Sequence, residues 1–79
     1  MDYSLIGYLS RRTIEETEMV LLYYMEESCW ETFHVTIDKI FLLLEQRYAQ
    51  EELPMPPKIT QAKLVHQYRL SLLEKQKEK

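Results

Sequence analysis

The segment Cys29–Gln50, CWETFHVTIDKIFLLLEQRYAQ, decides the fold, and it contains neither glycine nor proline. Its large apolar residues recur at intervals of three and four positions, which places them on one side of an α-helix that advances about 100° per residue. The stripe comprises Trp30, Phe33, Ile37, Ile40, Phe41, Leu44 and Tyr48. We therefore predict a long amphipathic helix whose apolar side faces the core.

A second helix is predicted upstream, beginning after Thr13. Thr13 and Glu16 have the spacing of a capping box, in which the hydroxyl accepts a hydrogen bond from a backbone N–H at the start of the helix. An apolar stripe follows at helical spacing, made up of Ile14, Thr17, Val20, Leu21, Tyr24 and Met25.

The two stripes point in nearly opposite directions if the chain from Thr13 to Gln50 is one helix. They centre on Leu21 and Ile37, and steps of about 100° per residue leave them about 160° apart. One straight helix cannot bury both in a common core. We predict a break near Ser28, because Ser28 and Glu31 have the spacing of a second capping box. The β-branched and aromatic residues of 29–37 leave a strand as the alternative there.

Two further helices and one connector complete the predicted architecture. The proline-rich connector 53–58 ends the long helix, because proline lacks the N–H donor that a helix needs. The last helix carries a stripe of Leu64, Val65, Tyr68, Leu72 and Leu73. We expect an all-α fold, a small helical bundle forming a single domain over residues 1–79. Its three main helices are expected at about 14–27, 29–50 and 60–76, with a short N-terminal helix at about 3–10.

Composition agrees with a helical chain. One glycine and no asparagine leave few residues for the tight turns of a sheet, and good helix formers dominate. No apolar run approaches the roughly 20 residues of a membrane span. No basic stretch precedes an apolar one near the N-terminus, and Cys29 has no second cysteine with which to pair. We therefore expect a cytoplasmic protein with no membrane association.

Residues suited to catalysis or metal binding are few. Glu31-x-x-His34 has the spacing of a metal-binding pair on one helix face, and Glu27 and Asp38 lie on a neighbouring arc. These acids also fit the solvated edge of a helix. No serine–histidine–acid pattern accompanies His66, and no glycine-rich loop is present to bind phosphate. We predict no catalysis, no metal and no cofactor.

Apolar residues that fall outside the stripes indicate an interaction surface. Met19 and Tyr23 lie among the acids of the second helix, Val35 and Leu42 lie opposite the Ile37 stripe, and Leu70 is expected on the outer side of the last helix. A core this small provides little stability, so burial of further apolar surface against a partner would stabilise the fold. We therefore predict a protein–protein interaction module, an adaptor or regulator that acts as a homodimer through these five residues.

The uneven charge leaves a second interpretation open. Residues 1–53 carry 4 basic and 11 acidic side chains, whereas residues 54–79 carry 6 basic and 2 acidic ones. The basic C-terminal helix has suitable side chains for phosphate contacts in Lys58, Lys63, Arg69, Lys75 and Lys77. The overall pI of about 5.3 opposes this use. A small helical nucleic-acid-binding regulator is therefore the alternative function.

Overall fold

The computed structural model describes the backbone of residues 2–77 and the side chains of residues 5–76. Within residues 2–77 the chain forms four helices and no strand. These helices are α1 (Asp2–Leu9), α2 (Ile14–Tyr24), α3 (Glu27–Gln50) and α4 (Pro57–Lys77). The predicted all-α class is confirmed, and the alternative strand at residues 29–37 is wrong, because these residues belong to the amphipathic helix α3.

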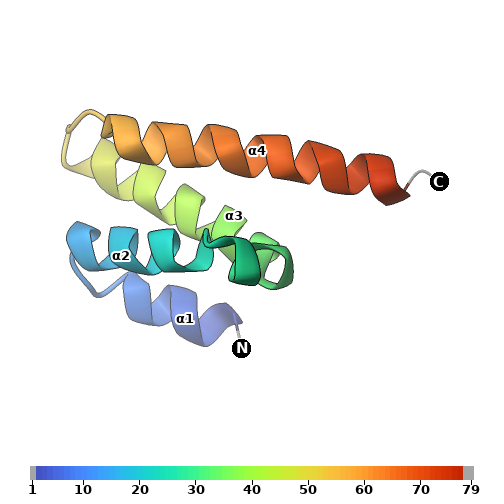
Figure 1. The fold of residues 1–79 in the computed structure, drawn as a ribbon. Helices are drawn as coiled ribbons and strands as arrows, with labels where there is room; N and C mark the ends of the chain where they lie inside the picture. The colour runs from blue at the N-terminus through green and yellow to red at the C-terminus, as the bar shows by residue number, and fades with distance from the viewer. Residues whose placement is uncertain (1, 78–79) are drawn as a thin grey trace.

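Helix α3 is central to the arrangement and packs against each of the other three helices (Figure 1). Its side chains Ile37, Ile40 and Leu44 are completely buried. All four helices contribute to the core, which consists of Leu9, Leu21, Met25, Trp30, Ile37, Ile40, Phe41, Leu44, Ile59 and Ala62. None of the described helices combines the length and the apolar character needed to cross a membrane.

The start of α2 follows the predicted capping box. Thr13 is extended, and its Oγ1 accepts a hydrogen bond of 3.1 Å from the backbone N–H of Glu16. The guanidinium of Arg47, near the end of α3, donates to the carbonyl of Arg12 at 2.8 Å. The turn between α1 and α2 is thus fastened to the far end of the central helix.

The break between α2 and α3 lies at Met25 and Glu26, two residues before the predicted position. Glu26 has an extended ψ of 144°, and its carbonyl accepts hydrogen bonds from the N–H groups of Cys29 and Trp30. Glu26 provides no side-chain cap, and Ser28 already lies inside α3. The second capping box is therefore not used. The earlier break lets Met25 pack beside Leu21 in the core.

The connector between α3 and α4 covers residues 51–56, two residues earlier than the predicted 53–58. Glu52 has a φ of 56°, and the N–H of Leu53 donates to the carbonyl of Tyr48 at 3.0 Å, so a left-handed residue ends α3 without a glycine. Helix α4 begins at Pro57 rather than near residue 60. Proline is well suited to this first position, because the first N–H groups of a helix have no partner within it.

The two capping-box serine and threonine residues make a matched test of the helix boundaries. We predict that Thr13→Ala lowers the free energy of unfolding by about 1 kcal/mol. Ser28→Ala should change it by less than about 0.5 kcal/mol, because Ser28 caps nothing and alanine favours a helix interior. Urea denaturation followed by circular dichroism measures both. An equal loss for Ser28→Ala would show that α3 begins at that residue instead.

Candidate interaction surface

Helix α4 turns a different side toward the core from the one that its sequence predicts. Its buried residues are Ile59, Ala62 and His66, and Leu73 packs partly against the core. Spacings of three, four and seven residues place these four on one side of the helix. The predicted stripe is therefore wrong except at Leu73, since the remaining four residues are exposed, namely Leu64, Val65, Tyr68 and Leu72.

A hydrogen-bonded cluster of Trp30, His66 and Asp38, here called the His66 cluster, explains this orientation. His66 is only 2% exposed. The indole Nε1–H of Trp30 donates to its Nδ1 at 2.9 Å, which leaves the proton on Nε2 to be donated to Asp38 Oδ1 at 2.5 Å. The ring also lies 5.4 Å from that of Phe41. Because both ring nitrogens have partners, His66 is buried without an unsatisfied polar atom.

Charged side chains fasten α4 to the body on either side of this cluster. The guanidinium of Arg69 donates to the carbonyl of Met25 at 2.7 Å and lies 5.7 Å from the Trp30 ring. Helix α2 has no basic residue in its own last turn, so Arg69 supplies the cation that opposes its dipole. Nearer the start of α4, Lys58 lies 3.7 Å from Glu18, and Lys63 pairs with Glu45.

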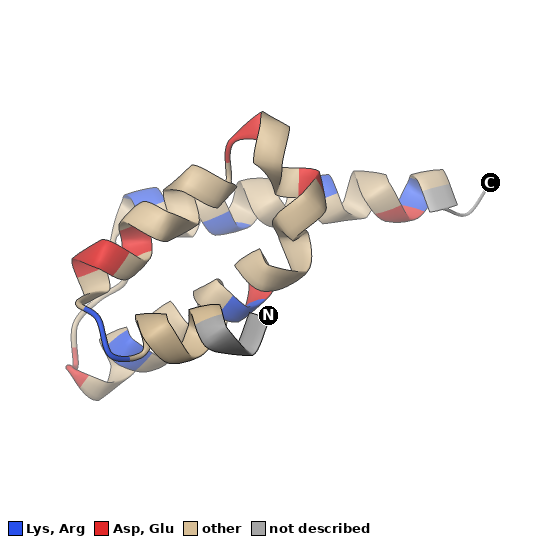
Figure 2. Cartoon of the chain, turned by 90° about the horizontal axis from the view of Figure 1, so that it is seen from below, with Lys and Arg blue, Asp and Glu red and all other residues tan. Residues whose placement is uncertain are grey.

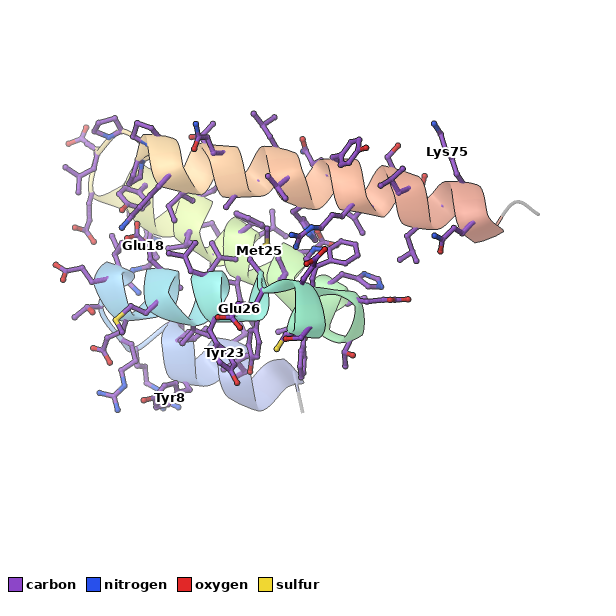
Figure 3. The ribbon with its side chains drawn as sticks, viewed as in Figure 1. Tyr8, Glu18, Tyr23, Met25, Glu26 and Lys75 are labelled. Atoms are coloured by element: carbon purple, nitrogen blue, oxygen red, sulfur yellow. The ribbon has the colours of Figure 1, made fainter. Side chains whose placement is uncertain are left out.

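Glu18 is the most deeply buried carboxylate in the described part of the chain, at 6% exposed. It accepts a hydrogen bond from the hydroxyl of Tyr48 and lies beside Lys58, so its charge is compensated from α3 and α4. Figure 3 shows Glu18 on the side of α2 that faces α4. Burial and the hydrogen bond to Glu18 raise the pKa of Tyr48 from 10.0 to about 12. The tyrosine therefore remains a hydrogen-bond donor throughout the neutral range.

One side of α4 is apolar and exposed to solvent. It consists of Leu64, Val65, Tyr68 and Leu72 and is called the outer face of α4. Leu64 and Tyr68 are 60% and 65% exposed. Leu64, Tyr68 and Leu72 follow one another at intervals of four residues, so they form a continuous strip. Lys75 continues this strip seven residues after Tyr68 and points away from the body (Figure 3).

The predicted interface residues are distributed over separate parts of the surface. Met19, Tyr23, Val35 and Leu42 are exposed, whereas Leu70 is half-buried against the core and does not lie on the outer side of α4. Figure 3 shows Tyr23 on the side of the bundle away from α4, and Met19 precedes it by one helical turn. These five residues therefore do not form one surface.

The structure does bring two of the predicted residues together. Leu42 from α3 and Leu70 from α4 line an open groove of about 410 Å³ between the two helices. The ion pair of Lys63 and Glu45 and the His66–Asp38 pair also line it. The groove is therefore lined by both apolar and charged side chains, and the charged ones are already paired with each other.

The basic residues predicted to contact phosphate are mostly engaged within the chain. Basic positions recur along α4 (Figure 2), yet Lys58, Lys63 and Arg69 bind Glu18, Glu45 and the Met25 carbonyl as described above. Lys75 is exposed. The side chain of Lys77 lies outside the described residues. The arrangement leaves little uncompensated positive charge along the described length of α4.

The residues with metal-like spacing do not converge. Among the described side chains, no group of three or more histidine, cysteine or acidic residues is placed to hold a metal ion. Asp38 contacts His66 rather than His34. The ring of His34 lies 5.5 Å from that of Trp30, and its Nδ1 is buried without a hydrogen-bond partner among the described residues.

No known protein family, curated protein or solved structure matches this chain. Its function is therefore inferred from the placement of its own residues. That placement provides one continuous apolar strip on α4 and several smaller exposed apolar sites on α2 and α3.

The hydrogen bond between Tyr48 and Glu18 predicts a loss of stability in strong alkali. A pKa raised from 10.0 to about 12 in the folded state means that the bond stabilises the fold below about pH 10 and loses its effect as pH rises through 12. The stability difference between the wild type and Tyr48→Phe should therefore shrink over this window. Urea denaturation at several pH values measures it, and a constant difference would contradict the assignment.

Proposed function

We propose that this protein is a protein–protein interaction module that pairs with a second copy of itself and serves as an adaptor or regulator of another macromolecule. The observation that supports the proposal best is the outer face of α4, where four large apolar side chains adjoin one another in solvent. Isolated exposed apolar residues are ordinary, but a continuous apolar strip is characteristic of a surface that binds a partner.

The chemistry of the buried polar groups favours binding over catalysis. A catalytic histidine held by a carboxylate needs its second nitrogen free to exchange a proton with a nucleophile or substrate. In the His66 cluster that nitrogen accepts a hydrogen bond from the Trp30 indole, which is a donor and cannot act as the nucleophile. These residues fix the orientation of α4 and thereby expose its outer face.

Binding to nucleic acid is supported less well. A site for phosphate needs cations that are free to release counterions on binding. Three of the basic side chains proposed for that role, Lys58, Lys63 and Arg69, already contact acceptors in the folded chain. A protein partner, by contrast, requires only the apolar strip that is already exposed.

Self-association is tested by the mass in solution. We predict that sedimentation equilibrium shows an increase from the 9.6 kDa of the monomer toward twice that value between about 10 µM and about 1 mM, as expected for an interface of modest size. The protein must remain fully helical by circular dichroism throughout. A mass of 9.6 kDa at every concentration would contradict pairing.

A further inference from the structure

Leu64, Tyr68 and Leu72 of the outer face form a pattern that is symmetrical about Tyr68, whereas Val65 has Ser71 in the mirrored position. Leu64 and Leu72 lie four residues before and after it, and Gln61 and Lys75 lie seven residues before and after it. A helix with such a pattern can pack against an identical helix that runs in the opposite direction. In a two-fold dimer each patch must be complementary to itself, and this strip meets that condition.

The direction of pairing follows from charge. An antiparallel pair centred on Tyr68 places Leu64 against the partner's Leu72, and Lys75 beside the partner's Gln61. A parallel pair would place the two Lys75 side chains together and align the two helix dipoles, both of which are unfavourable. The antiparallel arrangement avoids both repulsions.

Charge also favours α4 over α2 as the surface that meets a second copy. Helix α2 carries the exposed acids Glu15 and Glu16, and Figure 2 shows acidic positions on it. A contact through Met19 and Tyr23 would bring these acids close to their counterparts in the other copy. A contact through the outer face of α4, which contains no acid, keeps the two α2 helices far apart (Figure 1).

We propose that the occupant of the outer face of α4 is the same face of a second copy, packed antiparallel with the two-fold axis at Tyr68. This inference rests on the proposed function and assigns its surface and partner. The strip from Gln61 to Lys75 extends about 21 Å at 1.5 Å per residue. A single helix pair of that length lies at the small end of protein interfaces, so the dimer dissociates in the micromolar range.

Paired cysteines test this geometry in the full chain. Cys29→Ser first removes the single native thiol. Under mild oxidation, Tyr68→Cys should then form a disulfide between copies. Leu64→Cys and Leu72→Cys should each link poorly alone but link to each other when mixed. In the antiparallel pair, position 64 of one copy lies eight residues along the helix from position 64 of the other, and the same holds for position 72. Eight residues correspond to about 12 Å, whereas a disulfide spans at most roughly 7 Å between Cα atoms.

Gln67→Cys is the matched control, because Gln67 adjoins Tyr68 on the same helix but faces the groove toward α3. It should not link. The inference is overturned if Leu64→Cys links to itself and not to Leu72→Cys, which indicates a parallel pair. It is also overturned if the wild type dimerises and Tyr23→Glu dissociates the dimer while Tyr68→Glu does not. That second result leaves the proposed function standing, whereas a strict monomer removes both.

Discussion

The hydrogen bonds that His66 makes with Trp30 and Asp38 determine how the last helix meets the rest of the molecule. An imidazole with both nitrogens satisfied can be buried at little cost, whereas one left without partners in the core would be strongly destabilising. Both hydrogen-bond partners belong to α3, so the side of α4 that carries His66 faces the core. Both sides of α4 carry large apolar residues, so turning the His66 side toward the core leaves a second apolar side in solvent.

This arrangement connects stability with the proposed function. Four helices in 79 residues bury few large side chains, and α4 rests on α3 partly through ion pairs and the Arg69 contact at the end of α2. Figures 1 and 2 both show its last turns extending beyond the bundle. A second helix that packs on the outer face of α4 would remove its apolar side chains from solvent. We therefore regard pairing through the outer face of α4 as a way to complete the burial that one chain leaves unfinished.

Sequence periodicity predicted the parts of the fold that depend on apolar burial alone. The helical class and the Thr13 cap follow from spacing and are confirmed. The buried side of α3 is confirmed except at Phe33, which is 36% exposed. The sequence placed the break two residues too late. The capping-box spacing favours a break at Ser28, whereas the packing of Met25 in the core favours the earlier position. That packing is evident only in the folded structure. The predicted orientation of α4 was wrong, because apolar periodicity gives no weight to a histidine. This histidine is buried because it finds hydrogen-bond partners 28 and 36 residues away. The interface residues on α2 and α3 stay a prediction.

The orientation of α4 is measured most directly by NMR of the uniformly ¹⁵N-labelled protein. We predict a scalar coupling through the hydrogen bond between Trp30 Nε1 and His66 Nδ1, together with nuclear Overhauser effects between the rings of His66 and Phe41. We expect no such effects between Phe41 and the side chains of Leu64 or Tyr68 within one chain. Contacts from Phe41 to Leu64 or Tyr68, with no coupling at the Trp30 indole, would show that the apolar side of α4 faces the core and would contradict the account.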